Sequence, residues 1–443
     1  MDSDALIKET IQAAGIDQEE VSRLFQQWVG RAETSVDYSH LRPAPYVALD
    51  DPRRAQALQL GEEALRAGRV AAFTVAGGQG TRLGYNGPKG EYPATPVRDK
   101  PLFQLFAEKI RAMQIRYGRR IHWLIMTSLL NDAATQQFFA DNGYFGLAPQ
   151  QVRFFTQGQM PAVDAHSGQV LLAEPGRVAM SPDGHGGSLR ALVRSGSIDF
   201  LKENGVDTLS YFQVDNPLVQ CVDPVFIGLH LQDRAEISSK MVRKAYAAEK
   251  VGHFCLQTDG RQAVVEYSDL PQALQERTDP DTGALYFVAG SIAIHVLDVD
   301  FVARVGGGGD TSLALPFHFA HKKVPYVDAA GNRVSPEGPN AVKFEMFIFD
   351  ALPLAERSLI VETCREDEFS PIKNATGVDS AETSKLDQSA QALSWLAAVG
   401  ENVEGLRQAE VSPLFALTAE QFAERWNTLP EKPEITESFY VEP

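Results

Sequence analysis

Cysteine is scarce in this sequence, and the few cysteines lie far apart. The 443 residues include only Cys221, Cys255 and Cys364, and no CxxC pair occurs among them. An odd number at such distances excludes a disulfide framework and argues against a zinc site built from cysteine. The cysteine content therefore favours a reducing compartment, and we expect a cytoplasmic protein.

Positive charge and long apolar runs are also lacking. Lysine and arginine number 41 against 58 acidic residues, which gives a net charge of −17. A chain this acidic is a poor candidate for nucleic-acid or anionic-membrane binding. No apolar run reaches about 18 residues, and MDSDALIKET lacks the pattern of a signal peptide. We expect neither nucleic acid nor membrane as a partner, and a monomer or weak homo-oligomer.

The hydrophobic pattern divides the chain into three parts. Residues 1–65 form a helical N-terminal segment, in which Ile7, Ile11 and Ala14 recur at helical spacing. Residues 66–380 contain short apolar runs separated by helical patterns, which predicts an α/β domain with a mainly parallel sheet covered on both faces. Residues 381–443 are helical and acidic and form a small C-terminal unit. The four runs are RVAAFTVA, IHWLIMTS, VRFFTQ and TLSYFQVD.

Longer strand patterns begin near Ser238. The segments are SSKMVRKAYA, HFCLQTDGRQAVVEYS and LYFVAGSIAIHVLD. The Asp259-Gly260 pair within the second is a good hairpin turn. These segments predict an antiparallel extension of the same sheet, which makes the sheet mixed.

A glycine-rich loop, VAGGQGTRLGYNGPKGEYPATP, follows the first apolar run at residues 75–96. Glycines let backbone N–H groups approach a phosphate closely, and basic side chains add the charge that this acidic protein needs to hold a polyphosphate. The loop contains four such glycines and two basic residues: Gly77, Gly78, Gly80, Gly84, Arg82 and Lys89.

Three interpretations of this loop can be weighed from its residues. The first is a purely structural turn, which does not explain why glycines, Arg82 and Lys89 all follow one strand. The second is a dinucleotide site, but the loose GxGxxxG pattern is weak, and the next strand ends in Thr127 and Ser128 rather than in an acidic residue. The third is a Walker A loop, which would need a Gly-Lys-Ser/Thr that is absent here.

Ten ordered segments resemble the eukaryotic-type UDP-N-acetylglucosamine pyrophosphorylases, within the wider UDP-sugar pyrophosphorylase group. The resemblance implies a Rossmann-like nucleotidyltransferase (GT-A-like) fold. It runs from about residue 70 to 375 and is sparse in the tail, where SPLFAL is its clearest trace. The segments are GGQGTRLG, PLFQLFAEKI, FFTQGQMPAVD, SPDGHGGSLRAL, QVDNPLVQCVDP, EKVG, VVEYSDL, HKKVPYVD, KFEMFIFD and REDEFSPIKNA.

The resemblance also implies roles for individual residues toward UTP, sugar-1-phosphate and Mg²⁺. Arg82 and Lys89 would contact the phosphates of UTP, and Lys373 in SPIKN would bind the phosphate of the sugar phosphate or product. Asp215 in QVDN would hold the metal ion. The nucleotide positions are Ala76, Gly77, Gly78, Gln157 and Gly184, and the sugar positions are His185, Gly252, Glu266, Ser291, Phe347 and Phe349.

Two sugar-facing positions depart from the family pattern. The family has Asn where this chain has His185, and Asn where this chain has Ser291. The UTP half of the site is intact, so the expected reaction is UTP plus a sugar-1-phosphate giving a UDP-sugar and pyrophosphate. N-acetylglucosamine-1-phosphate is the leading substrate, and glucose, galactose and N-acetylgalactosamine phosphates stay open. Two other functions also stay open: a nicotinamide-dependent oxidoreductase, and a sugar-nucleotide-binding protein without catalytic activity.

Overall fold

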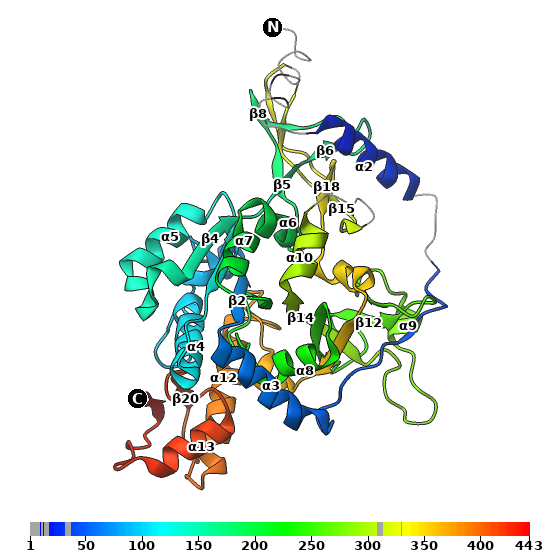
Figure 1. The fold of residues 1–443 in the computed structure, drawn as a ribbon. Helices are drawn as coiled ribbons and strands as arrows, with labels where there is room; N and C mark the ends of the chain where they lie inside the picture. The colour runs from blue at the N-terminus through cyan, green and yellow to red at the C-terminus, as the bar shows by residue number, and fades with distance from the viewer. Residues whose placement is uncertain (1–8, 10–11, 13–16, 32–36, 308–312, 329) are drawn as a thin grey trace.

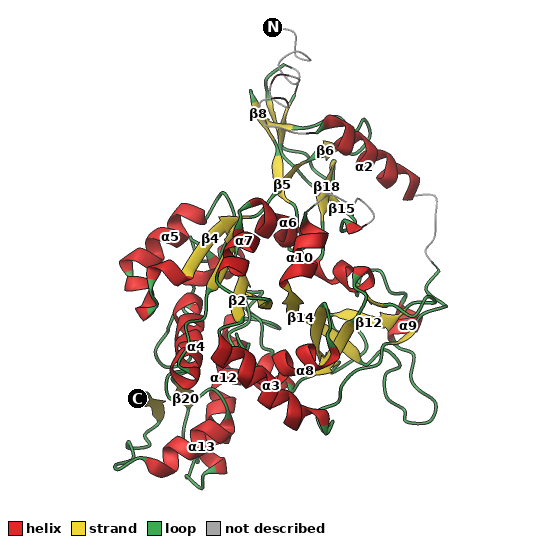
Figure 2. Cartoon of the chain, viewed as in Figure 1, coloured by secondary structure: helices red, strands yellow, loops and turns green. Residues whose placement is uncertain are grey.

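The computed structural model describes residues 9, 12, 17–31, 37–307, 313–328 and 330–443. The helix predicted around Ile7 and Ala14 lies outside these residues. Within the described part of the chain, ten strands form one mixed sheet, whose main path runs β1-β12-β14-β10-β2-β3-β4 (Figure 2). The mixed α/β fold predicted from the sequence is confirmed.

The parallel half of the sheet consists of the four predicted apolar runs. They form β2 (Val70–Val75), β3 (Trp123–Thr127), β4 (Val152–Thr156) and β10 (Thr208–Gln213). Strand β10 pairs in parallel with β2, β2 with β3, and β3 with β4. These strands lack a polar face because helices cover the sheet on both sides.

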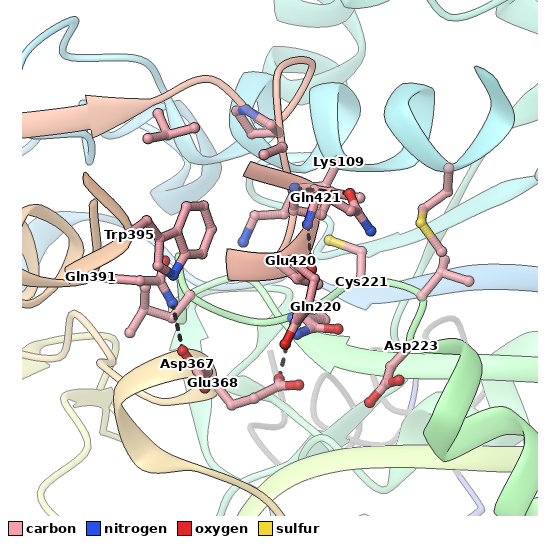
Figure 3. A pocket seen from close by; sticks show the side chains of 18 of the residues that line it. Lys109, Gln220, Cys221, Asp223, Asp367, Glu368, Gln391, Trp395, Glu420 and Gln421 are labelled. Atoms are coloured by element: carbon pink, nitrogen blue, oxygen red, sulfur yellow. Dashed lines mark hydrogen bonds between the residues drawn. The ribbon is translucent and has the colours of Figure 1, made fainter. Parts of the chain in front are cut away.

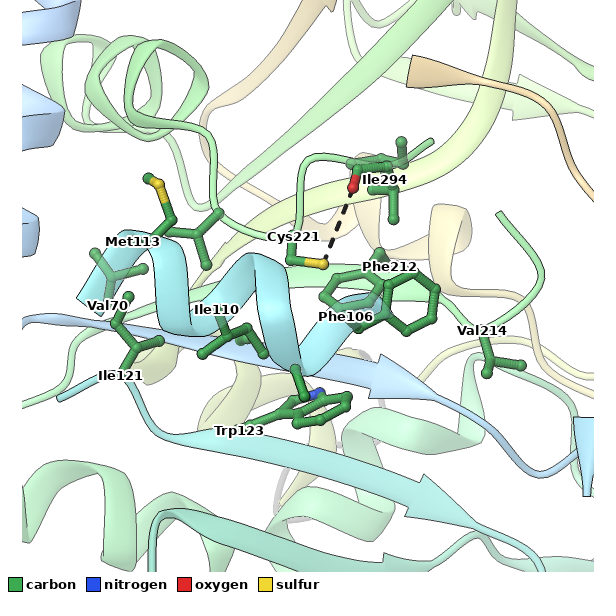
Figure 4. Packing of buried hydrophobic residues seen from close by; sticks show 14 of the residues in the cluster. Val70, Phe106, Ile110, Met113, Ile121, Trp123, Phe212, Val214, Cys221 and Ile294 are labelled. Carbon is green, nitrogen blue, oxygen red and sulfur yellow. Dashed lines mark hydrogen bonds between the residues drawn. The ribbon is translucent and has the colours of Figure 1, made fainter. Parts of the chain in front are cut away.

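The two faces of the sheet have separate cores. From β2, Val70 and Ala72 join the core under α3 (Arg53–Ala67), α4 (Leu102–Tyr117) and α8 (Pro224–Asp233), part of which Figure 4 shows. Ala71 and Phe73 join the opposite core, under α6 (Gly187–Arg194), α7 (Ser197–Glu203) and α10 (Val299–Gly306). This alternation follows from the period of two along a strand.

The predicted antiparallel extension is also present. Strands β11 (Ile237–Arg243) and β10 both pair antiparallel with β14 (Ala289–Asp298), and β11 also pairs with β19 (Ser358–Glu362). Strands β12 (Gly252–Leu256) and β13 (Gln262–Val265) form a hairpin around Asp259-Gly260, and β1 (Arg42–Pro43) pairs with β12. The antiparallel strands β12 and β14 bring the predicted sugar positions beside β10.

Two smaller units flank the main sheet (Figure 1). Helix α2 (Gln18–Arg31) packs on a small sheet of β6 (Val163–Asp164), β15 (His318–Lys322) and β18 (Ala341–Glu345). At the other end, α12 (Ala381–Ala398), β20 (Gln408–Val411), α13 (Ala419–Thr428) and β21 (Ser438–Val441) share a core of their own. The spacing of Phe347 and Phe349, two residues apart in KFEMFIFD, predicts that both lie on one strand. This prediction is wrong, because β18 ends before them and Ile348–Leu354 is a short 3-10 helix.

Candidate active site

The predicted nucleotide loop and the predicted metal ligand meet at one edge of the sheet. Ala76 directly follows β2 and Asp215 follows β10, and these two parallel strands are neighbours. Ligands of open α/β sheets bind beyond the carboxyl ends of such strands. Lys89, from the glycine loop, lies with its Nζ 3.5 Å from Oδ2 of Asp215. The structure therefore places a cation of the loop beside the carboxylate.

The glycine loop folds back on itself, and a side chain from outside the loop holds its backbone by hydrogen bonds. The N–H of Gly80 donates to Gly87 O at 2.9 Å, and the N–H of Lys89 donates to Gly78 O at 3.1 Å. The buried Asn131 side chain donates to Ala76 O at 3.0 Å and to Gly78 O at 3.3 Å. Sequence reasoning missed this residue, although an asparagine just before a helix that follows a buried strand is a typical N-cap signal.

The remaining predicted nucleotide positions lie around this loop. A Cβ on Gly77 would come within 2.5 Å of Gln157 Oε1, so the Gln157 side chain lies directly against the loop backbone. Gly184 has a φ of +84°, and a Cβ there would lie 2.4 Å from Met346 O. Both positions thus require glycine, one for close approach and one for its backbone conformation. Arg82 is exposed on the Thr81–Leu83 turn, away from the sugar cavity described next.

A cavity of about 150 Å³ opens beside Asp215. It brings together residues from β10, β12 and β14, from the segments after β13, β18 and β19, and from the segment before α6. Lys250 also lines it and was missed, because a lone exposed lysine carries no sequence signal. The predicted residues on its wall are His185, Asp215, Gly252, Glu266, Ser291, Phe349 and Lys373.

The imidazole of His185 is neutral and has one hydrogen-bonding atom already in use. Its Nδ1 accepts from the N–H of Ile348 at 3.2 Å, so its proton is on Nε2. Phe347 stacks on the ring at 5.4 Å between centroids and lies behind His185 rather than on the cavity wall. Burial, with a smaller contribution from His318, lowers the pKa of His185 to about 4. Near neutral pH, His185 can therefore offer the cavity a single N–H donor.

The opposite wall combines a small strand pair with a carboxylate. Gly252 of β12 faces Ser291 of β14 in register. A Cβ on Gly252 would lie 2.5 Å from a methyl of Val264, so only glycine leaves this wall undisturbed. Burial, with a smaller contribution from Asp269, raises the pKa of the Glu266 carboxyl group above its ordinary value. Apart from Asp215 and the lysines, the cavity thus presents one N–H donor from His185, one hydroxyl from Ser291 and the carboxyl group of Glu266.

Backbone and side-chain hydrogen bonds fasten Lys373 beside Asp215. The N–H of Ile372 donates to the backbone carbonyl of Asp215 at 2.8 Å. The buried Asn216 amide donates to Glu368 O at 2.6 Å and accepts from Ser370 N–H at 3.1 Å. Asn216 was also missed, because its partners lie more than 150 residues away in the chain.

The surroundings of Asp215 fit one kind of metal site. Among the described residues, no three His, Cys, Asp or Glu side chains gather as a ready-made ion cage. Magnesium is commonly held by one or two carboxylates together with substrate phosphates. A single carboxylate with Lys89 and Lys373 nearby therefore fits a Mg²⁺ ion shared with phosphates, and does not fit a self-sufficient structural metal.

This sheet with its glycine loop defines a nucleotidyltransferase-type protein. The chain belongs to the UTP–glucose-1-phosphate uridylyltransferase family, whose model matches residues 18–437. Its sequence is 36% identical over 404 residues to the UDP-N-acetylglucosamine pyrophosphorylase of Saccharomyces cerevisiae, covering 88% of this chain and 83% of that protein. The predicted resemblance is confirmed.

Two further proteins are similar to this chain. A UDP-N-acetylhexosamine pyrophosphorylase-like protein 1 from Xenopus tropicalis is 41% identical over 333 residues, which are 74% of this chain but 64% of that protein. The chain thus matches less than two thirds of that relative's length. The fold is also similar to a crystal structure from Trypanosoma brucei, that of the uridine diphosphate N-acetylglucosamine pyrophosphorylase in complex with inhibitor. The TM-score is 0.83 and the sequence identity is 26%. The match covers 100% of this chain and 93% of that chain. No helix in the described residues is both long and apolar enough to cross a membrane.

Proposed function

We propose that this protein transfers uridylate from UTP to a sugar-1-phosphate, with N-acetylglucosamine-1-phosphate as the preferred substrate. The observation that carries the proposal is the meeting of Lys89, Asp215 and Lys373 between a glycine loop and a small polar cavity. The names of the yeast and trypanosome relatives support the same substrate class.

The proposed reaction is a single in-line displacement. A phosphate oxygen of the sugar phosphate attacks the α-phosphorus of UTP, and the bond from that phosphorus to the pyrophosphate oxygen breaks. The attacking monoester is largely dianionic near neutral pH because its second pKa is about 6. No general base is therefore needed, and the barrier is the repulsion between two anions.

The residues around the loop would lower that barrier by position and charge. Lys89 would hold the α-phosphate, and Lys373 would hold the incoming phosphate beside it. Arg82 would stabilise the departing pyrophosphate, and its side chain is exposed on the loop. Asp215 would hold a Mg²⁺ ion, which would supply positive charge against the negative charge that develops on the phosphates.

The nucleotide and the sugar would be read by different groups. Gln157 and the backbone at Ala76, Gly77, Gly78 and Gly184 would contact the nucleotide. Phe347 would support the His185 ring from behind. The groups that would contact the sugar are His185, Gly252, Glu266, Ser291 and Phe349.

The decisive experiment is a panel of sugar-1-phosphates incubated with UTP and Mg²⁺ and followed by pyrophosphate release. We expect the highest kcat/KM with N-acetylglucosamine-1-phosphate. Pyrophosphate release only with glucose- or galactose-1-phosphate would move the assignment to another UDP-sugar. If the protein binds UTP but releases pyrophosphate with none of the sugar phosphates, it would be assigned as a nucleotide-binding protein without catalytic activity. The nicotinamide-dependent alternative is not retained, because the family and its neighbours are uridylyltransferases and pyrophosphorylases.

We also propose a cytoplasmic enzyme that is a monomer or weak homo-oligomer. The three free cysteines, two of them buried, support a reducing compartment. Light scattering during size-exclusion chromatography would measure the oligomeric state. A stable dimer at low micromolar concentration would contradict this part of the proposal.

A further inference from the structure

A buried lysine lies behind the candidate active site and joins two of its segments. Lys240, on β11, is 2% exposed, and its Nζ lies 2.7 Å from Oδ2 of Asp223 and forms a second ion pair with the buried Glu368. Asp223 is eight residues after Asp215, and Glu368 is five residues before Lys373. One ammonium group thus connects the segment of the proposed metal ligand with the segment of the proposed phosphate ligand.

The segment that follows Asp215 depends on side chains for its shape. All residues between β10 and α8 are described, and they form neither helix nor strand. Lys109 Nζ, from α4, donates to Pro217 O at 2.6 Å and to Val219 O at 2.8 Å. Glu368 Oε2 accepts from the backbone N–H of residue 220 at 3.2 Å, the contact that Figure 3 marks. Side chains from two other parts of the chain therefore hold this segment.

Asp223 fixes the far end of the same segment. Its Oδ1 accepts from the N–H groups of Val225 at 2.9 Å and Phe226 at 3.3 Å, which makes Asp223 the N-cap of α8. Its Oδ2 binds Lys240, whose Nζ also lies 5.3 Å from the centroid of the Phe226 ring. The carboxylate therefore ties the segment both to a helix and to the lysine on β11.

The segment that carries Lys373 is aligned with this one through Glu368. The backbone carbonyl of Glu368 accepts from the Asn216 side chain at 2.6 Å, and the N–H of Ile372 donates to Asp215 O at 2.8 Å. The carboxylate of Glu368 is bound to the buried lysine. The segment is thus fixed at one end by an ion pair and near Lys373 by a backbone hydrogen bond.

Stability alone is a weak reason for an ion pair this deeply buried. Removing the charges from water offsets much of their attraction, and apolar side chains of similar volume often stabilise a core as well or better. The ion pairs do fix a geometry, because one Nζ must stay within bonding distance of two carboxylates. Fixed geometry matters most where two groups must hold reactants in line.

We propose that Lys240 is a positioning residue, which sets Asp215 and Lys373 relative to each other without touching the substrates. The proposal rests on the uridylyltransferase function proposed above. It predicts that loss of Lys240 impairs the use of the sugar phosphate through these two residues, and that the glycine loop still binds UTP.

The alignment of the two segments can be tested without any assumption about the reaction. Lys240→Met keeps the length of the side chain and removes its charge. Amide hydrogen exchange of the full chain, followed by mass spectrometry, should become at least about tenfold faster in residues 214–223 and 369–373, the scale of losing a charged hydrogen bond. Unchanged exchange in both segments would overturn the proposal.

Lys100→Met is the matched control. Lys100 forms a similarly buried ion pair with Glu108 at 2.7 Å. This variant should lose stability and leave the exchange of both segments as in the wild type. Equal effects of Lys100→Met and Lys240→Met on these segments would show a general loss of stability and would overturn the assignment.

A second variant separates positioning from stability. Lys240→Met leaves two buried carboxylates without their cation, which is strongly destabilising. Lys240→Met with Glu368→Gln removes one of these charges and leaves Asp223 as an ordinary N-cap, so its melting temperature should exceed that of Lys240→Met. Exchange in both segments should nevertheless stay fast, because no ion pair joins them. Recovery of slow exchange and normal turnover together with stability would contradict the positioning role.

Kinetics test whether Lys240 acts through Lys373. Lys240→Met should lower kcat/KM for the sugar phosphate by roughly 10- to 100-fold, the scale for misplaced reacting groups, with UTP affinity by calorimetry unchanged. Combined with Lys373→Ala, its loss should be smaller than the product of the two single losses, whereas Lys100→Met should combine with Lys373→Ala additively. Additive losses for Lys240 would mean that it does not act through Lys373 and would overturn the proposal.

The two readouts also distinguish this proposal from the proposed function. If the wild type turns over none of the sugar phosphates while Lys240→Met speeds exchange in both segments, the uridylyltransferase function is refuted and the alignment of the segments by Lys240 stands. Turnover by the wild type, with unchanged exchange and unchanged kinetics in Lys240→Met, would refute the positioning role alone.

Discussion

The two halves of the candidate active site are built from different parts of the polypeptide. The nucleotide half depends on backbone: the loop after β2, the close approach of Gln157 to Gly77, and the left-handed Gly184. The sugar half depends on side chains from segments far apart in the chain, among them His185, Ser291 and Lys373. A site made of backbone tolerates little change, whereas a site made of side chains can change specificity by single substitutions.

Asp215 lies where the two halves meet, so its loss should have the largest effect. Asp215→Asn keeps the shape of the side chain but removes its charge. We expect kcat to fall at least about 100-fold, the scale for losing a transition-state electrostatic partner. Steady-state pyrophosphate release at saturating Mg²⁺ measures it.

Asp207→Asn is the matched control. Asp207 precedes the opposite end of the same strand, where it forms an exposed ion pair with Arg69 at 2.7 Å. Turnover of this variant should match wild type. Near-normal turnover of Asp215→Asn, with a normal melting temperature, would mean that no catalytic metal ion is held at this carboxylate.

Replacement of Lys89, in the nucleotide half, and of Lys373, in the sugar half, should change different kinetic constants. Lys89→Ala should lower kcat/KM with every sugar phosphate by roughly 10- to 100-fold, because a charged hydrogen bond contributes about 1.5–3 kcal/mol. Lys373→Ala should act chiefly through KM for the sugar phosphate or through kcat, with UTP binding retained. The measurements are kcat and KM for both substrates, together with UTP affinity by calorimetry.

Lys250 is a useful control for both variants, because it is exposed at the rim of the same cavity. Lys250→Ala should change these constants by less than about threefold, since exposed charge contacts contribute at most about 1 kcal/mol. Full activity of Lys89→Ala would count against the assignment of the whole glycine loop.

The sequence predicts the nucleotide half better than its surroundings. Buried parallel strands are apolar along their length, so β2, β3, β4 and β10 are recognisable from composition alone, and the loop follows directly from β2. The N-cap position of Asn131 is recognisable from the sequence, but its bonds to the glycine loop, 53 and 55 residues away, are not. Asn216 is not recognisable at all, because its partners lie more than 150 residues away.

Phe347 shows how a local error arises. Alternating aromatic residues in EMFIFD suggest a strand, because a period of two is the usual strand signal. In the structure β18 stops at Glu345, and Phe347 packs on His185 and His318 while Phe349 reaches the cavity. Contacts with residues distant in the sequence determine the backbone conformation here, and a local sequence pattern does not contain them.

Substitution in the sugar half should shift selectivity and leave the nucleotide half unchanged. His185→Asn with Ser291→Asn supplies two amides in place of one N–H donor and one hydroxyl. We expect the preference for N-acetylglucosamine-1-phosphate over glucose-1-phosphate to rise about tenfold. This is within the range of selectivity that hydrogen bonds to one substrate group can give. The ratio of the two kcat/KM values measures it, with KM for UTP as the internal control. An unchanged ratio would mean that these positions do not read the sugar.

The smallest expected effect concerns the pH dependence of sugar selectivity, which tests the contribution of His185 to the sugar half. Its pKa of about 4 lies below the ordinary value of 6.5, so the ring stays neutral above pH 5.5 and gains a proton only as the pH falls toward 4. The ratio of kcat/KM for the two sugar phosphates cancels the titration that their phosphates share. We therefore expect this ratio to vary less than about twofold between pH 6 and 8.5, because the His185 ring does not change charge in that range. A ratio that changes with a midpoint near 6.5 in the wild type and becomes flat in His185→Asn would show a charged His185 reading the sugar, and the neutral single-donor description of this pocket would then be wrong.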